Sequence, residues 1–231
     1  MRLTFCNLTT IAATALIFSG SAHATDNTAV LTTNGTAYPW TSIGGGSNGG
    51  TIAWLFTVGS GVVLTVDYLG FYDPADVALG DAHPVALWDT NQNLLAQVTI
   101  PSGVGANYLS GYAYQHLSSS VTLNAGNTYV LGAFFPAASS DKLLVQATNQ
   151  QFDSNITWVQ PAQTVFNPQQ TNIAYPSNLL SPNGIYQEAF FGPTFRFTAA
   201  SVPEPSTYTF FGLGALALIV AGRRKFGTSR R

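Results

Sequence analysis

The chain has a single cysteine, Cys6, only three histidines and very few charged side chains among its 231 residues. Lys, Arg, Asp and Glu together make up 8% of the residues, against roughly 25% in an average globular protein. The scarcity of cysteine excludes a disulfide framework and a cysteine-based metal site. Gly, Ser, Thr, Asn and Gln must supply the polar surface instead, which is common in proteins that work outside the cytoplasm.

Basic residues are nearly missing from the central part of the chain. Between residues 25 and 202, nine acidic residues stand against only Lys142 and Arg196, which gives a formal charge of −7. Because phosphate contacts need clustered Lys and Arg, we expect no nucleic-acid partner. The remaining basic residues lie at the two termini: Arg2, Arg223, Arg224, Lys225, Arg230 and Arg231.

The N-terminal segment has the three parts of a secretory signal. Arg2 supplies a basic start, an apolar run extends from about Leu8 to Phe18, and Ala22 and Ala24 form a small-x-small cleavage site. We therefore expect residues 1–24 to be a signal peptide that is cut after Ala24 and removed together with Cys6. An uncleaved anchor is the alternative, but the apolar run is shorter than the about 20 residues that a spanning helix needs.

The central part is rich in apolar and aromatic side chains, which make up 46% and 13% of the whole chain. β-Branched and aromatic residues gather in short runs that are separated by turn residues. We expect one all-β domain over residues 25–201, an antiparallel, jelly-roll-like β-sandwich with no helix of useful length. Its nine strands are expected at Thr51–Val58, Val62–Tyr72, Pro84–Asp89, Leu94–Ile100, Gly111–Leu117, Thr128–Phe135, Lys142–Thr148, Ile156–Gln160 and Pro193–Ala199.

The connectors also carry information. Residues 59–61, 89–93 and 124–127 have hairpin length and contain residues that tolerate positive φ. The glycine-rich stretch Ile43–Gly50 is expected to be a flexible connector. The region Gln150–Gln187, rich in Pro, Asn and Gln, is expected to form long loops over one end of the sandwich, where a binding site would lie.

Candidate catalytic residues are few. His83 and His116 are the only histidines after the signal peptide, and no Gly-x-Ser-x-Gly element accompanies them. We therefore predict no enzyme activity and no catalytic residues, and we interpret both histidines as solvated or hydrogen-bonded structural residues. Two distant histidines are also a poor start for a zinc site.

An acidic stretch offers oxygen ligands that would suit Ca²⁺, although the spacing of an EF-hand is absent. We favour turn-forming, solvated carboxylates there and predict no metal and no cofactor, while Ca²⁺ binding by the loop Asp73–Asp81 stays open. The carboxylates concerned are Asp67, Asp73, Asp76, Asp81 and Asp89.

The four tryptophans divide into two pairs. Trp54 and Trp88 lie in apolar strands and are predicted to be core residues. Trp40 and Trp158 lie nearer to loops and are candidates for stacking on sugar rings.

The last thirty residues, 202–231, have a different character. Val202, Pro203, Glu204 and Pro205 leave the domain as an extended segment, because two prolines fix φ and remove backbone donors. Fifteen uncharged residues follow, Tyr208–Gly222, which as a helix of about 22 Å form a short membrane span. Arg223, Arg224 and Lys225 then act as a membrane stop that keeps the C-terminus in the cytoplasm.

This combination resembles the PEP-CTERM sorting signal of exopolysaccharide-producing Gram-negative bacteria. The resemblance implies that an exosortase, a membrane cysteine protease, cuts near Pro203-Glu204-Pro205 and releases or transfers the protein outward. The central segment, with "VDYLGFYDPADVALGDAHPVALWDTNQNLLAQVTIP" and "VTLNAGNTYVLGAF", resembles the β-sandwich of many PEP-CTERM proteins of unknown function.

Together these features predict an exported, non-enzymatic protein of the cell surface or extracellular matrix. Its precursor is held transiently in the inner membrane, its processing partner is an exosortase, and extracellular polysaccharide is a further candidate partner. The alternatives are a carbohydrate-binding or Ca²⁺-dependent adhesion module and, less favoured, a glycan-active hydrolase.

Overall fold

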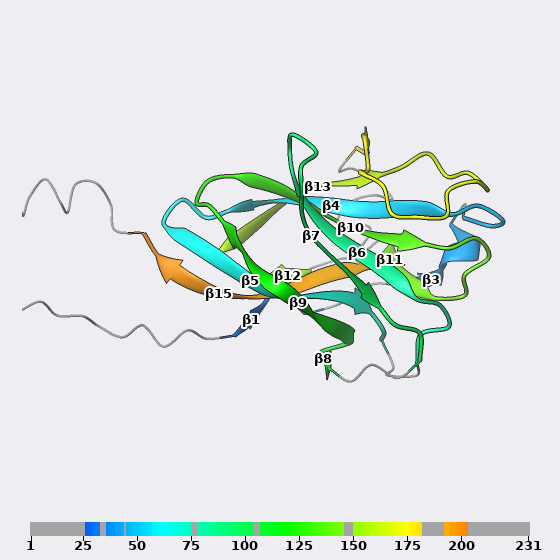
Figure 1. The fold of residues 1–231 in the computed structure, drawn as a ribbon, viewed down its shortest axis with the longest axis horizontal. Coiled ribbons are helices and arrows are strands. Elements are labelled where there is room, and N and C mark those ends of the chain that lie inside the picture. Colours follow the sequence, from blue (N-terminus) through cyan, green and yellow to red (C-terminus); the bar gives the residue numbers. More distant parts are fainter. Residues whose placement is uncertain are drawn as a thin grey trace, which may run out of the picture.

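The computed structural model describes residues 26–32, 36–43, 45–74, 78–103, 107–145, 150–181 and 192–202. These residues form two antiparallel sheets that lie one above the other (Figure 1). The five-stranded sheet has the order β1 (Asn27–Thr28), β15 (Pro193–Ser201), β5 (Val62–Tyr72), β9 (Tyr112–Leu123) and β8 (Tyr108–Leu109). The six-stranded sheet has the order β14 (Asn178–Leu179), β13 (Ile156–Gln163), β4 (Gly50–Val58), β10 (Thr128–Phe135), β6 (His83–Asp89) and β7 (Leu94–Ile100).

Two small ladders complete the described part. The strand β11 (Lys142–Val145) pairs with β3 (Thr36–Pro39), and β12 (Gln151–Phe152) pairs with β2 (Val30–Thr32). The helical content of the described residues is one 3₁₀ turn, Trp40–Ser42. The prediction of an all-β, antiparallel fold is therefore confirmed.

Each of the nine predicted strands is present. The bounds of β5, β7 and β10 agree with the prediction. Two strands are longer than predicted by three or more residues: β9 continues to Leu123, because its second half pairs with Leu64–Val66, and β13 continues to Gln163 along β4. The two-residue strands β1, β8, β12 and β14 were not predicted, since they carry too few residues to show an alternating pattern.

The core lies between the two sheets. In β4, Ile52, Trp54 and Phe56 point inward and are fully buried. The indole Nε1 of Trp54 donates a hydrogen bond of 2.9 Å to the carbonyl oxygen of Pro193 in the opposite sheet. Phe195 packs against Phe56 with ring centroids 4.9 Å apart. Alternation along the strands therefore places the large aromatic side chains in one shared interior.

The outer face of the six-stranded sheet carries a second, smaller apolar cluster. Ala53, Leu55, Ala86, Trp88, Val130 and Ala162 form it, and Ile173 and Tyr175 pack against it. The predicted burial of Trp88 is confirmed, although on this outer face and not between the sheets. We predicted that the region Gln150–Gln187 forms loops over one end of the sandwich. This is wrong for the segment around Ile173 and Tyr175, which lies across the outer face of the six-stranded sheet. Hydrophobic burial accounts for the difference, since an uncovered face would expose Trp88 and its alanine neighbours.

The glycine-rich stretch after Trp40 is also more than a connector. The Trp40 indole donates a hydrogen bond of 2.9 Å to the carbonyl oxygen of Asn48. A Cβ atom on Gly45 would come within 2.2 Å of the Trp40 ring, and one on Gly50 within 2.3 Å of the Phe166 ring. Glycine at these two positions therefore lets the backbone approach the aromatic rings closely.

Candidate functional site

Three loops and the end of the last strand meet at one end of the sandwich: the β6–β7 hairpin loop and the β4–β5 and β9–β10 loops, which connect the two sheets. The amide of Val58 donates to the carbonyl oxygen of Asn127 at 3.0 Å, which joins the β4–β5 turn to the β9–β10 loop. Tyr129 pairs with Asp89 across β10 and β6, so the β6–β7 loop lies on the same side. The amide of Val202 donates to the carbonyl oxygen of Gly61 at 2.8 Å, which places the exit of β15 at this end as well.

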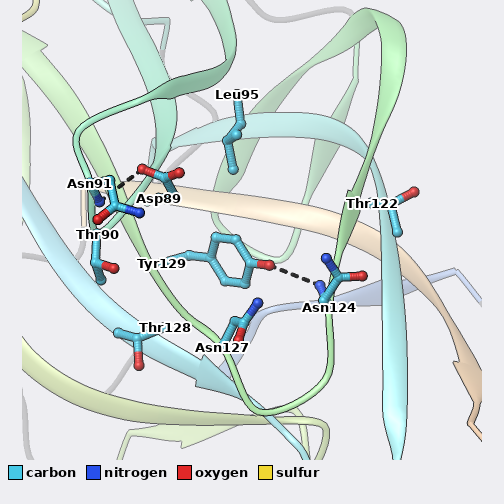
Figure 2. A pocket seen from close by; sticks show the side chains of 9 residues that line it. All are labelled: Asp89, Thr90, Asn91, Leu95, Thr122, Asn124, Asn127, Thr128 and Tyr129. Carbon is cyan, nitrogen blue, oxygen red and sulfur yellow. Dashed lines mark hydrogen bonds between the residues drawn. The ribbon is translucent and has the colours of Figure 1, made fainter.

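Two of these loops enclose a hollow of about 350 Å³, which we call the loop-end hollow (Figure 2). Its floor carries Tyr129, and the side chains of the β6–β7 and β9–β10 loops surround it. Nine residues line it: Asp89, Thr90, Asn91, Leu95, Thr122, Asn124, Asn127, Thr128 and Tyr129. With one carboxylate, three amides and three threonine hydroxyls, it is a strongly polar site between the β6–β7 hairpin and the β9–β10 loop that connects the two sheets.

Asp89 organises the first of the two loops. One carboxylate oxygen, Oδ1, accepts the backbone amides of Asn91 and Asn93 at 2.9 Å each, and Oδ2 accepts the side-chain amide of Asn93 at 2.7 Å. The hydrogen bonds from the side chain and backbone of Asn93, together with that from Asn91, lower the pKa of Asp89 against the opposing effect of burial. The hollow therefore carries a negative charge over the whole physiological pH range.

Tyr129 connects the floor of the hollow to the second loop. Its side chain is 5% exposed, and its hydroxyl oxygen accepts the backbone amide of Asn124 at 2.8 Å. The side chains of Asn124 and Asn127 are exposed and make no hydrogen bond within the residues that the structure describes. Their amides are held at the rim and are available to a ligand (Figure 2).

The lining determines which ligands the hollow can take. It contains no Lys, Arg or His, so nothing in it balances an anionic ligand. Asp89 is its only carboxylate, and no group of three or more His, Cys, Asp or Glu residues suited to a metal occurs in the described part of the chain. The arrangement is chemically suited to hydrogen bonding with a neutral, polar molecule.

His83, a candidate catalytic residue in sequence, lies at the opposite end of β6 and is completely buried. Its Nε2 lies 2.8 Å from Oδ2 of Asp141, and its Nδ1 lies 2.9 Å from the carbonyl oxygen of Phe134. Its ring stacks on Phe71, with ring centroids 3.8 Å apart and an interplanar angle of 6°. Both ring nitrogens are thus engaged away from solvent, so His83 is the hydrogen-bonded and not the solvated residue of the two alternatives expected for it.

Asp141 links His83 to the loop that precedes β6. Its Oδ1 accepts the amide of Gly80 and its Oδ2 accepts the amide of Asp81, each at 2.9 Å. Burial alone raises the pKa of Asp141, but the hydrogen bonds from His83, Gly80 and Asp81 outweigh it, so that the pKa lies below its usual value. Asp141 was not singled out in the sequence, because 58 residues separate it from His83.

The remaining sequence candidates do not assemble into a site. His116 is exposed on β9, where its ring packs in a T-shaped contact with Tyr68, the ring centroids 4.7 Å apart. Asp67 accepts a hydrogen bond from the Ser120 hydroxyl, so it lies apart from the loop Asp73–Asp81. Asp76 lies outside the described residues.

The two tryptophans suggested for sugar stacking pack against the protein interior instead. Trp40 is fully buried and stacks on Phe135 with ring centroids 4.9 Å apart, so its predicted role is wrong. Trp158 is partly buried and packs against the main core. The 3₁₀ turn closes Trp40 inward, an outcome that depends on contacts with Phe135 and Phe166, both distant in sequence.

The last strand leads directly into the sorting segment. β15 ends at Ser201, and Val202 is 40% exposed while its amide is still bonded to Gly61. Residues 201–225 match the PEP-CTERM protein-sorting motif. The chain therefore carries a PEP-CTERM sorting signal. Such a motif implies a secreted, membrane-anchored precursor that an exosortase processes.

The PEP-CTERM match covers 25 of the 231 residues and does not extend over the β domain before residue 201. No curated protein matches the chain. Among the described residues there is no helix with the length and apolar character needed to cross a membrane. The predicted signal cleavage site at Ala22 and Ala24, the Pro203-Glu204-Pro205 tripeptide, the segment Tyr208–Gly222 and the membrane stop at Arg223, Arg224 and Lys225 all lie outside those residues.

Proposed function

We propose that this chain is an exported, non-enzymatic protein that an exosortase releases to the cell surface or the extracellular matrix, where its jelly-roll-like β domain is the working part. The observation that carries the proposal is the position of the sorting motif. The motif begins at residue 201, within the last strand of the domain, and Val202 is still hydrogen bonded to Gly61. A cut after this point would release the domain with all the described strands intact.

The surroundings of the histidines support a non-enzymatic role. His83 cannot reach a substrate, because its ring is buried and both nitrogens are engaged with Asp141 and Phe134. A general base must approach the proton that it removes to hydrogen-bond distance. His116 is exposed, but its ring partner is Tyr68, and no carboxylate orients it within the described residues.

The decisive experiment compares the mass of the protein in native cells with its mass in an exosortase-lacking strain. We expect a form that has lost its C-terminus outside wild-type cells, and the full-length form in the membrane fraction of the mutant strain. Replacing Pro203, Glu204 and Pro205 together by Ala in wild-type cells should also retain the larger form in the membrane. A matched control, in which Thr228 and Ser229 beyond the motif become Ala, should be processed normally.

The proposal fails if the protein keeps its C-terminal Arg231 in both strains. In that case the C-terminal segment is a permanent anchor, and the protein is a membrane-held surface domain. Separating the culture supernatant from the surface-bound and polysaccharide fractions then distinguishes the surface from the matrix as the destination.

A further inference from the structure

We propose that the loop-end hollow binds a neutral oligosaccharide or polysaccharide chain. This ligand class deepens the function proposed above, and its biological setting rests on that function. The binding itself follows from the residues that line the hollow and is tested separately.

The hydrogen-bonding inventory of the hollow matches that of a sugar. Each sugar hydroxyl both donates and accepts, so a sugar site needs both kinds of partner. Asp89 supplies acceptors only, whereas the amides of Asn91, Asn124 and Asn127 supply both kinds. Oδ2 of Asp89 accepts a single hydrogen bond from the described residues and therefore keeps a free acceptor position. The Tyr129 hydroxyl accepts from Asn124, and its own proton has no acceptor in the part of the chain that the structure describes.

Charge selects against other polar ligands. An anionic glycan or a phosphate would meet the Asp89 carboxylate with no cation in the lining to offset it. A divalent cation would find one carboxylate where Ca²⁺ takes six to eight oxygen ligands. A neutral polyhydroxylated chain meets neither obstacle. The volume of about 350 Å³ lies at the small end of the range for ligand sites. This size suits a short stretch of a sugar chain that continues beyond the hollow on both sides.

The hollow is organised before any ligand arrives. Three hydrogen bonds hold the β6–β7 loop on Asp89, and the Tyr129 hydroxyl holds the β9–β10 loop at Asn124. The strands β6 and β10 that carry these loops are neighbours in the six-stranded sheet. A site that needs little ordering loses less free energy on binding, so a few hydrogen bonds can produce measurable affinity.

The location of the hollow affects how binding is measured. It shares its end of the sandwich with Val202, and five residues separate Val202 from the uncharged segment that starts at Tyr208. Five extended residues span at most about 18 Å, so a membrane or a micelle on that segment would lie close to the hollow. The test therefore uses the full chain with a twenty-residue Gly-Ser spacer inserted after Val202, in a detergent without a sugar head group.

The experiment titrates this protein with neutral hexasaccharides (cellohexaose, maltohexaose, mannohexaose and galactohexaose) and with the anionic hexasaccharide of alginate. Calorimetry or ligand-observed NMR reports binding. We expect at least one neutral probe to bind and the alginate probe not to bind. Asn124→Ala and Asn127→Ala should each weaken binding about two- to tenfold, the effect of one lost hydrogen bond. The matched control Asn178→Ala, an exposed Asn on the edge strand β14, should leave the affinity unchanged.

Several outcomes would overturn the inference. One is a Kd above about 5 mM for every neutral probe. Another is tighter binding of the alginate probe than of any neutral probe. A third is neutral binding that Asn124→Ala and Asn127→Ala leave intact, which would place the sugar elsewhere. Because both side chains are exposed, the variants should keep the wild-type thermal transition, which separates loss of binding from loss of fold. The result does not depend on exosortase cleavage, so the inference and the proposed function can fail independently.

Discussion

Changing Asp141 to Asn tests whether a buried ion pair anchors the loop before β6. Both ring nitrogens of His83 face oxygen acceptors, at 2.8 Å and 2.9 Å. If the ring donates both of these hydrogen bonds, it carries a proton on each nitrogen, and the Asp141 carboxylate balances that charge. An Asn side chain would remove this balance. It also has only one oxygen that can accept, so its NH₂ group would face donors that need a second acceptor.

The magnitude follows from the burial of the pair. Removing one partner of a buried ion pair typically costs about 3 to 5 kcal/mol. Because the Asp141 side chain is 10% exposed and water reaches one edge of it, we take the lower end, about 3 kcal/mol. For a domain of this size, that loss corresponds to a fall in Tm of about 6 to 12 °C. Urea and thermal unfolding of the two proteins, followed by tryptophan fluorescence, would measure it.

The pH dependence of this difference is a further check. The lowered pKa of Asp141 means that its carboxylate stabilises the fold above the unfolded-state value of about 3.9, and that this contribution is lost as the pH falls through the folded-state pKa. The gap between wild type and Asp141→Asn should therefore be full at pH 7 and should shrink below about pH 4.

A control and a refuting result complete the test. Asp81→Asn removes the same charge from the adjacent loop, where the side chain makes no hydrogen bond to the described residues, and should change stability by less than about 0.5 kcal/mol. If Asp141→Asn costs as little as this control, the ring does not depend on a negative partner and the ion-pair argument is wrong.

Two other predictions concern the faces of the two sheets. Trp88→Ala should cost about 3 to 5 kcal/mol in denaturant unfolding, because it empties the outer cluster between Gly132 and Tyr175; a loss under about 1 kcal/mol would place Trp88 at the surface. Burial raises the pKa of Tyr112 and Tyr114, so their neutral forms stabilise the fold below the unfolded-state value of about 10 and stability should fall as the pH rises above it. Absorbance at 295 nm should then show these two phenols ionising only as the domain unfolds, and smooth ionisation of every tyrosine near pH 10 in folded protein would contradict the burial argument.

The positions of several strands can be predicted from local sequence. The limits of β5, β7 and β10 follow from alternation and from the turn residues that flank them. Residues that tolerate positive φ at 89–93 and 124–127 likewise predicted that Asp89 and Asn124 would lie at turns, where the structure has them. The sorting signal is equally local, since its tripeptide, apolar stretch and basic cluster follow one another along the chain and together match a sequence motif.

Other features depended on contacts between distant residues. Trp40 follows a proline near loops, and its burial depends on Phe135 and Phe166, to which no local pattern points. The pairing of His83 with Asp141 depends on how the loop before β11 meets the start of β6.

The loop-end hollow shows the same division most clearly. Sequence alone determined that residues 89–93 and 124–127 are polar turns and that the C-terminal segment is a sorting signal. Only the tertiary structure decided that both turns, together with Val202, share one end of the sandwich. The physical reason is that strand order and register are set by burial of side chains over the whole domain, through pairs such as Tyr129 with Asp89. A turn residue acquires neighbours only when those long-range pairs have formed.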